Sequence, residues 1–225
     1  MTGNPFDPTY KNLPREVAVF PLAGTLLLPR GHLPLNVFEP RYLNLVQAAL
    51  AGPRMFGMIQ PVAGGQMGLS VGDDAPLYST GCIGRITSFQ ETEDRRFLIN
   101  LRGVCRFDVV EELSILDGYR RVRASFERFQ GDLTEDTTTR IDRQRLLGGL
   151  HAYFDREGIS TEWNVLEETP DERLITTLAM ACPFDSPDKQ ALLECVDLEH
   201  RAKLIIGLLE AELRAGDDDD TPARH

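Results

Sequence analysis

The sequence predicts an α+β protein in which a β-rich part is followed by a helical part. Between residues 15 and 130, short runs rich in Val, Ile, Leu and Phe are separated by proline, glycine and aspartate, which is typical of short β-strands. After Gly131 and Asp132, apolar residues recur every three or four positions, the period of amphipathic helices. A chain of 225 residues is long enough to bury a sizeable core.

These changes of pattern divide the chain into four expected segments. Residues 1–14 contain three prolines and no periodicity, so we expect an irregular N-terminal arm. Residues 15–130 form the β-rich lobe and residues 131–215 a helical bundle lobe. Residues 216–225 include four consecutive aspartates and are expected to be an acidic, disordered tail. The glycine-rich stretch 61–76 is expected to be a mobile loop.

The stretch from residue 17 to residue 50 carries the clearest signals. Three apolar runs, at 17–20, 25–28 and 33–38, predict strands separated by prolines, which lack a ladder N–H and therefore end strands or lie on sheet edges. A helical stripe then begins after Pro40, a residue suited to a first helical turn, and Gly52 is suited to its end. The stripe consists of Tyr42, Leu45, Val46, Ala49 and Leu50.

Further strands are expected at 82–89, 96–102, 105–110 and 119–126, with turns at 91–94 and 116–118. A partly closed antiparallel barrel would hide the edges of this many short strands. In the second half we expect a helix ended by Gly158, a helix opened by a capping box at 169–172, a helix opened at 186–188, and a last helix capped by Asp197. Short loops between them predict antiparallel packing.

Composition narrows the function. No apolar window reaches the length of a membrane span, and the N-terminus lacks the pattern of a signal peptide, so a cytoplasmic protein is expected. The formal net charge is −11, with +1 in residues 1–130 and −12 in residues 131–225. Nucleic acid is therefore disfavoured as a partner, because phosphate backbones attract a net basic surface. Nine basic and eight acidic residues in 85–128 predict cross-strand ion pairs instead.

Patterns of catalytic or metal-binding sites are missing from the sequence. There is no Walker motif and no G-x-S-x-G motif, and the glycines of 61–76 are not followed by the lysine of a phosphate loop. The cysteines and histidines are too far apart for a zinc site, so neither a metal nor a cofactor is expected. They are Cys82, Cys105, Cys182, Cys195, His32, His151, His200 and His225. A Cys82–Cys105 disulfide is a disfavoured alternative to free, buried thiols.

The sequence resembles the N-terminal, substrate-binding domain family of Lon proteases over most of residues 15–214. The resemblance rests on FPLAGTLLLPRGHLPLNVFEPRY at 20–42, and on further matches at 81–86, 103–107, 189–194 and 198–202. It implies a PUA-like β pseudo-barrel with one helix, followed by an all-α helical bundle. It also implies a non-enzymatic module, since the ATPase and peptidase parts of Lon proteases follow this domain.

The resemblance further implies binding of unfolded polypeptide substrates, or of a protease or chaperone partner. The candidate peptide-binding residues are Phe38, Glu39, Arg41 and Tyr42, at the start of the predicted helix. A structural role is the competing interpretation, in which Glu39 favours the helix start, Arg41 pairs with an acid and Tyr42 packs under the barrel. A regulatory small-molecule sensor and a PUA-like RNA-binding protein remain alternative functions. Oligomeric state is not predicted.

Overall fold

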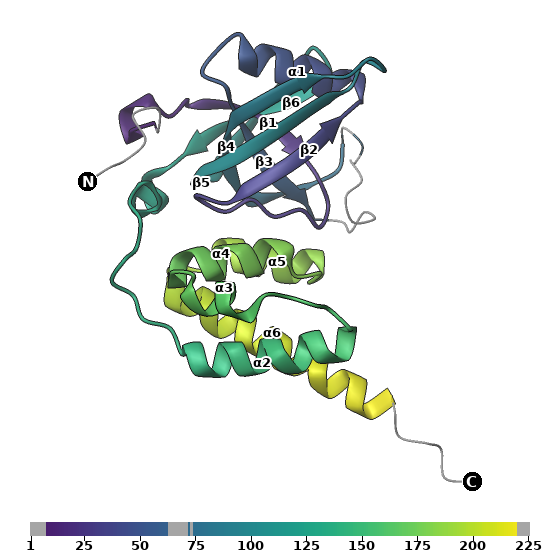
Figure 1. Cartoon of the computed structure of the whole chain (residues 1–225). Coiled ribbons are helices and arrows are strands. Elements are labelled where there is room, and N and C mark those ends of the chain that lie inside the picture. Colours follow the sequence, from purple (N-terminus) through teal and green to yellow (C-terminus); the bar gives the residue numbers. More distant parts are fainter. Residues whose placement is uncertain (1–7, 63–71, 73, 220–225) are drawn as a thin grey trace. The chain divides into compact units, whose positions relative to one another are not determined.

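The structure is a computed structural model of the whole chain and describes residues 8–62, 72 and 74–219 (Figure 1). The chain forms two compact units. The β unit consists of Met1–Glu135 and Asp185–Glu194, and the helical unit consists of Asp136–Phe184 and Cys195–His225. The stretch 185–194 was expected in the helical lobe of residues 131–215, but its contacts place it with the β unit.

The β unit is built on one six-stranded mixed sheet. The strands are β1 (Glu16–Pro21), β2 (His32–Val37), β3 (Met55–Pro61), β4 (Leu77–Glu91), β5 (Phe97–Leu116) and β6 (Tyr119–Ser125). Their order is β2-β5-β4-β3-β1-β6, and an additional β5–β6 pairing closes the last five strands into a ring. The sheet is therefore partly closed, as predicted, and β2 pairs with the first part of β5, before the part of β5 that pairs with β6.

Three expectations about the strands are wrong. The strands expected at 96–102 and 105–110 are parts of one long strand, β5. The barrel is not purely antiparallel, because β1 pairs with β3 in parallel. The connection between them contains β2 and a helix, which is long enough to return the chain to the same end of the sheet. The apolar run at 25–28 is not a strand but a buried loop, whose Leu26, Leu27 and Leu28 are at most 2% exposed.

Helix α1 (Pro40–Leu50) forms as the sequence predicts, with a proline in its first turn and Tyr42, Leu45, Val46 and Ala49 buried. It packs against β3 and β6. The predicted turn at 116–118 joins β5 to β6 through Asp117 and Gly118, both with positive φ, the conformation of a tight hairpin. The amide of Asn44 in α1 donates to the carbonyl oxygen of Asp117 at 2.9 Å.

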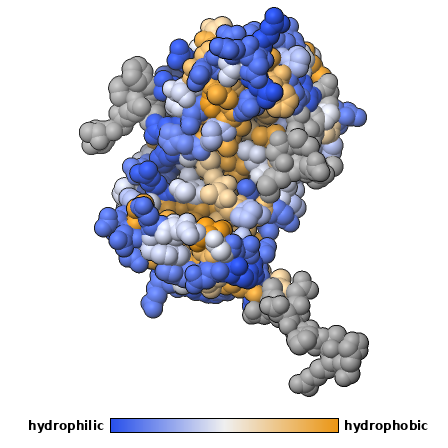
Figure 2. All heavy atoms as spheres, turned by 45° about the vertical axis from the view of Figure 1, so that its right-hand side comes forward, coloured by the Kyte–Doolittle hydropathy of each residue, from blue (hydrophilic) through white to orange (hydrophobic). Residues whose placement is uncertain are grey.

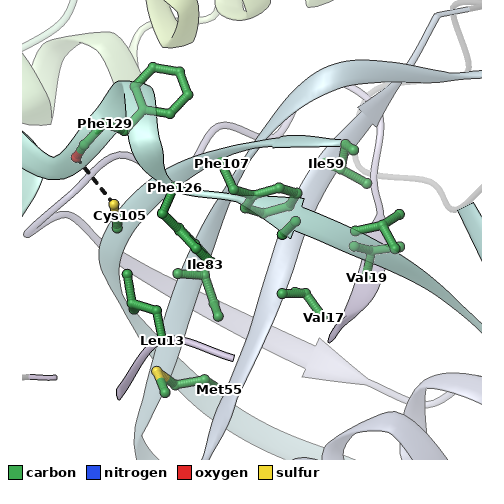
Figure 3. Close-up of a cluster of buried hydrophobic side chains, with 12 residues drawn as sticks. Leu13, Val17, Val19, Met55, Ile59, Ile83, Cys105, Phe107, Phe126 and Phe129 are labelled. Atoms are coloured by element: carbon green, nitrogen blue, oxygen red, sulfur yellow. Dashed lines mark hydrogen bonds between the residues drawn. The ribbon is translucent and has the colours of Figure 1, made fainter. Parts of the chain in front are cut away.

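The core of the β unit lies inside the strand ring. Side chains from β1, β3, β4, β5 and β6 meet around the fully buried Phe107, as Figure 3 shows. Leu13 from the chain before β1 and Phe129 from the chain after β6 complete this cluster. The segments before β1 and after β6 therefore contribute to the same core as the strands.

Two short helices continue the β unit beyond its last strand. They are η2 (Glu127–Leu133), a 3-10 helix at the predicted lobe boundary, and α5 (Ser186–Glu194). The guanidinium of Arg106 on β5 pairs with the Asp132 carboxylate at 2.7 Å and donates to the Leu193 carbonyl oxygen at 2.9 Å. One buried arginine therefore holds both helices to the sheet.

The helical unit contains α2 (Arg143–Glu157), α3 (Trp163–Glu168), α4 (Asp171–Ala181) and α6 (Leu198–Asp219), with α2 and α4 packed against α6. Gly158 ends α2 with a φ of 65°, as predicted. Asp197 caps α6, as predicted, by accepting a hydrogen bond from the His200 amide at 2.9 Å. Neither α3 nor the short η1 (Tyr10–Asn12) was predicted.

The predicted capping box at 169–172 is not formed. The Thr169 hydroxyl donates to the Val165 carbonyl oxygen of α3, and a Glu172 carboxylate oxygen accepts from the Asp136 amide. Both side chains therefore serve other segments than the start of α4. Helix α6 extends into the predicted tail as far as Asp219. The remainder of the tail, residues 1–7 of the arm and most of the 61–76 loop lie outside the described residues.

Candidate functional site

The four residues singled out in the sequence lie at the junction of β2 and α1. Glu39 is the N-cap of α1 with an extended backbone, and its carboxylate pairs with the Arg41 guanidinium at 3.1 Å. Both side chains are partly exposed, at 31% and 22% respectively. This ion pair therefore joins the N-cap residue of α1 to a residue of its first turn.

Tyr42 is buried, with 2% of its surface exposed. Its ring stacks on the Phe20 ring of β1 with 3.8 Å between centroids, and the Arg41 guanidinium carbon lies 4.7 Å from the centroid of the Tyr42 ring. Stacking of this kind fixes the start of α1 against the sheet. In this structure Tyr42 therefore supports the surface from beneath instead of being part of it.

Phe38 is the member of the predicted set that faces solvent, with 58% of its surface exposed. It follows directly on β2, and the Arg96 guanidinium lies 5.5 Å from its ring. Leu98, two residues beyond Arg96 on β5, is 41% exposed. An aromatic and an aliphatic side chain are thus available to a partner at this end of β2.

The second feature of the site is the free edge of β2. Within the described residues, β2 pairs with β5 and with no other strand. Pro34 lies in the middle of β2. Because proline has no backbone N–H, it cannot donate to β5, and this position fits the sheet if its backbone groups point away from β5, toward the free edge. By the alternation of a strand, the N–H groups of His32 and Asn36 face the same way.

The exposed face beside this edge is set by strand register. Residues paired across neighbouring strands share a face of the sheet, and the following three rows lie on one face of β2, β5 and β4. The rows are His32–Arg102–Arg85, Pro34–Asn100–Ser88 and Asn36–Leu98–Gln90. All nine side chains are exposed or half-buried, whereas Val37, Phe97, Ile99 and Leu101 of the opposite face are buried. The row at one end of this face contains His32, Arg102 and Arg85, and the row at the other end contains Leu98.

Sequence reasoning had not assigned Leu98, Asn100 and Arg102 to a site. The segment 97–102 reads FLINLR, in which Phe97, Ile99 and Leu101 alternate with the three residues of the exposed face. That alternation indicates a half-buried strand. The register that brings this face beside His32 could not be read from the sequence.

Hydrophobic residues reach the surface of both units among many hydrophilic ones in the view of Figure 2.

The arginines of the β unit are largely engaged with acids, as predicted. Arg123 of β6 and Glu111 of β5 are paired across strands and form an ion pair of 2.6 Å. Arg120 forms an ion pair of 2.6 Å with Glu112, and Arg128 pairs with Asp108 at 2.8 Å. These pairs balance much of the positive charge of the arginine-rich strands.

The buried cysteines are poorly suited to nucleophilic chemistry. Burial raises the pKa of Cys105 to about 12, helped by the nearby Asp132 charge, and raises the pKa of Cys82 well above its ordinary value. The thiolate is the reactive form of cysteine. All four cysteines are free thiols, although β4 and β5 run side by side.

No group of three or more His, Cys, Asp or Glu suited to a metal ion occurs in the part of the chain that is described. The histidines lie apart. His32 is at the β2 edge, His151 stacks on Trp163, and His200 pairs with Asp197. In the same part of the chain, no helix combines the length and the apolar character needed to cross a bilayer.

Curated relatives of this chain are Lon proteases. Lon protease 2 of Sorangium cellulosum is 27% identical over 224 residues, which cover 94% of this chain and 27% of that protein. Lon protease 2 of Myxococcus xanthus is 24% identical over 200 residues, covering 88% of this chain and 24% of that protein. The chain thus spans about a quarter of the length of the curated relatives it matches.

Solved structures share the fold. A Lon N-terminal domain protein from Xanthomonas campestris has a TM-score of 0.59 and 22% identity, covering 85% of this chain and 97% of its own. The N-terminal domain of a Mycobacterium avium complex Lon protease has a TM-score of 0.59 and 19% identity, and the match covers 87% of this chain and 98% of that chain. The family described as the ATP-dependent protease La (LON) substrate-binding domain matches residues 16–211. This chain therefore belongs to the Lon substrate-binding domain family.

Proposed function

We propose that this chain recognises extended, unfolded polypeptide segments through the free edge of β2, and that it carries out no catalytic step itself. Membership of the substrate-binding domain family supports recognition of polypeptide. The free backbone groups of β2 are the observation that carries the proposal, because a sheet edge can pair with a strand of almost any sequence. A substrate-binding module needs that tolerance.

The side chains at the Phe38 end of the edge provide the apolar contribution. Phe38 and Leu98 are both more than 40% exposed, and an incoming strand beside Asn36 would cover part of both. Burying such side chains is worth about 25 cal/mol per Å² of apolar surface. Main-chain pairing lets the edge accept many peptide sequences, and these two side chains add a preference for apolar residues in the peptide.

Glu39, Arg41 and Tyr42 act in this proposal by positioning Phe38. The Glu39–Arg41 ion pair and the Phe20–Tyr42 stack fix the start of α1, directly after Phe38. Glu39 and Arg41 are exposed enough to touch the end of a bound segment as well. We accordingly expect Tyr42→Ala to weaken binding through Phe38, without a direct contact between Tyr42 and the peptide.

The non-catalytic part of the proposal rests on the extent of the family match. That match is to a substrate-binding domain and covers residues 16–211. Delivery of the bound segment to a protease or chaperone partner is the associated role. The ion pairs of the arginine-rich strands favour a polypeptide over RNA as the ligand.

The test uses fluorescence anisotropy with labelled nine-residue peptides of an extended, neutral sequence containing one Phe. In a strand paired on one side, alternate N–H groups point toward the partner strand. N-methylation of every second amide should therefore abolish binding when the methylated amides are those that face β2, and leave binding nearly unchanged when they are those that face away. Equal effects of the two methylation patterns would exclude strand addition.

Protein variants locate the surface. Phe38→Ala and Leu98→Ala should each weaken peptide binding about threefold or more. Val110→Ala and Ile115→Ala are matched controls, since both residues are exposed apolar positions of β5 outside the β2–β5 pairing. Binding that falls equally in the controls, or that persists in a Phe38→Ala/Leu98→Ala double variant, would place recognition on another surface.

A further inference from the structure

We propose that the helical unit carries a second binding surface, for peptide segments in which one large apolar residue has lysine or arginine on both sides. The surface lies on α3 and on the loop that leads into it, and consists of Ile159, Glu162, Val165 and Glu168. We refer to these four residues as the α3 surface. This proposal goes beyond the β2 edge and is independent of it, because α3 and β2 belong to different units.

Val165 is the apolar centre of the α3 surface. It is 57% exposed, and Ile159, in the loop between α2 and α3, is 44% exposed. The opposite side of α3 faces α2, since the Trp163 ring stacks on the His151 ring with 3.3 Å between centroids, and its centroid lies 5.7 Å from that of Phe154. Two positions along a helix correspond to a rotation of about 200°, so Val165 points away from α2 and toward solvent.

Two carboxylates flank Val165 on this side of α3. Glu162 precedes Val165 by three positions and Glu168 follows it by three, and residues three apart on a helix are neighbours on its surface. Both glutamates are exposed. Glu162 is the N-cap residue of α3, but its side chain makes no capping hydrogen bond, so its carboxylate is not engaged with the helix. An apolar side chain between two acidic ones thus faces solvent.

The negative charge around α3 is not neutralised inside the chain. Residues 155–168 include five acidic side chains and one basic side chain, that of Arg156, which pairs with Glu157 at 2.8 Å. Within the described residues, the other four acids of this stretch form no ion pair, and they are Asp155, Glu162, Glu167 and Glu168. A lysine or arginine of a partner would therefore meet negative charge that no other cation shares.

Two acids of α6, by contrast, have cations of their own. Glu210 pairs with Arg145 at 2.7 Å, and Glu199 pairs with Lys203 at 2.5 Å. The Arg143 guanidinium at the end of α3 bonds to backbone carbonyl oxygens of that helix and to a carboxylate of α4. The unpaired carboxylates are therefore found beside the exposed apolar residues of α3. Grouped apolar side chains mark interaction surfaces, and the charge beside them selects a partner of opposite sign.

Trp163 makes the binding directly measurable, because it is the only tryptophan of the chain and lies on α3. The probe is a nine-residue peptide without aromatic residues, in which two lysines precede and two follow a single leucine and the other positions are serine. Titration of the full chain should give a saturable change in Trp163 fluorescence. Replacing the leucine with serine should weaken binding about fivefold, because less apolar surface is buried. Replacing the lysines with glutamates should abolish binding, and raised salt should weaken it.

Charge variants locate the site of the lysines. Glu162→Gln together with Glu168→Gln should weaken binding of the lysine–leucine peptide about threefold or more, because two unshared charges are lost while the side-chain size is kept. Glu127→Gln together with Glu199→Gln is the matched control, since it removes the same charge from exposed positions of η2 and α6. This control should bind the peptide nearly as wild type does.

Val165→Ser tests the apolar contact and should also weaken binding of this peptide. Because Val165 faces solvent, the fluorescence of the free variant should equal that of wild type, with the stack of Trp163 on His151 intact. A Phe38→Ala/Leu98→Ala double variant should bind the lysine–leucine peptide unchanged, because both of these residues belong to the β unit.

The outcomes separate this proposal from recognition at the β2 edge. Equal weakening in the two double glutamine variants, or equal binding of the leucine and serine peptides, would mean a general attraction of cations and overturn the α3 surface. Loss of binding in Phe38→Ala/Leu98→Ala but not in Val165→Ser would assign the peptide to the β2 edge, with the same consequence. Failure of the lysine–leucine peptide to bind at all overturns the α3 surface and leaves strand addition at β2 standing.

Discussion

Gly103 lies where β5 passes the loop that carries Leu28. A β-carbon at this position would come within 1.9 Å of the Leu28 carbonyl oxygen and 2.7 Å of its carbonyl carbon. The close approach is held by backbone hydrogen bonds, from the Arg30 amide to Gly103 and from the Gly103 amide to Gly31. In the sequence, Gly103 lies between the strands expected at 96–102 and 105–110, and nothing there indicates which backbone it contacts.

We therefore expect Gly103→Ala to lower the free energy of unfolding by about 3 kcal/mol or more, because backbone must move to admit one methyl group. Gly148→Ala is the matched control. Gly148 lies inside α2 with nothing within 4 Å of its added β-carbon, so this change should stabilise by about 0.5–1 kcal/mol. Urea denaturation of both variants measures the difference, and similar effects would contradict this packing.

The Cys105 thiol should make the stability of the folded chain depend on pH in the alkaline range. Its pKa rises from an ordinary 9.0 to about 12, first because the thiol is buried and then because of the Asp132 charge. The unfolded chain thus loses this proton first, and between about pH 9 and about pH 12 it binds fewer protons than the folded chain. Stability from this group is complete below pH 9 and falls as pH rises toward 12.

The measurement is urea denaturation at pH 8, 9, 10 and 10.5. Wild-type protein should lose stability with rising pH more steeply than Cys105→Ala, whatever the difference at pH 8. Tyr119 and Tyr153, whose pKa values are also raised by burial, contribute to both proteins and cancel in the comparison. Parallel pH profiles would mean that the Cys105 thiol titrates alike in both states.

Only some residues of the candidate site could be predicted from the sequence. Phe38 was singled out because it lies at the start of the predicted helix, and its exposure of 58% comes from the structure alone. Tyr42 belongs equally to the helical stripe, and the structure buries it. Leu98 and Arg102 depend on the register between β2 and β5, which is a long-range property that local periodicity does not contain.

Among the elements, α3 is the least predictable and the most dependent on one side chain. It has six residues and no buried ones, and it is too short to be stable on its own. The Arg143 guanidinium of α2 donates to the carbonyl oxygens of Leu166, Glu167 and Thr169 at 2.6–2.8 Å, and also pairs with Asp171 of α4. A cation at a helix C-terminus satisfies carbonyls that have no partner within the helix.

Arg143→Met should accordingly release the end of α3 and destabilise the chain by about 1–3 kcal/mol. Arg143→Lys should recover only part of this loss, because one ammonium group cannot bond three carbonyl oxygens and a carboxylate together. Hydrogen exchange of the α3 amides, together with urea denaturation, measures both effects. Unchanged exchange in Arg143→Met would show that α3 is held by other contacts.

Helices with local signals were predicted well, and strands less so. Pro40 and Gly158 mark helix boundaries through backbone properties of their own, so α1 and the end of α2 could be read directly. The run 25–28 has the composition of a strand, but it has no place in the strand order of the described residues, and the Leu28 carbonyl oxygen accepts from the Gly31 amide in a turn. Which residues pair is decided by tertiary contacts, so composition alone predicted a strand at 25–28 that does not form and divided β5 into two strands, at 96–102 and 105–110.

At the level of the whole chain, the two compact units are not continuous in sequence. Residues 185–194 belong to the β unit, between two segments of the helical unit. The signals at 186–188 predicted that a helix begins there, but they did not indicate which unit it joins. That choice is made by buried polar groups, including Gln60, whose amide donates to the Ser186 carbonyl oxygen at 3.1 Å, and Gln190, whose amide donates to the Thr80 carbonyl oxygen at 3.2 Å.

Such polar contacts are costly to leave unmade, so the β unit should depend on α5. In a fragment of residues 1–135, the Arg106 guanidinium would lose the Leu193 carbonyl oxygen and Gln60 would lose both Ser186 and Gln190. Each unsatisfied buried group costs about 1–3 kcal/mol. We expect this fragment to melt well below the full chain, or to fold incompletely.

Adding a synthetic peptide of residues 183–196 should raise the melting temperature of the 1–135 fragment in proportion to the logarithm of peptide concentration, because the peptide binds the folded form only. A Gln190→Ala peptide should stabilise less, since it loses the contacts with Thr80 and Gln60. An Ala191→Gln peptide is the control, because Ala191 is exposed and glutamine forms helices nearly as well. If the fragment melts like the full chain and ignores all three peptides, α5 is not part of the β unit. If it responds as expected, the unit that carries the β2 edge is completed by a helix encoded far beyond its last strand.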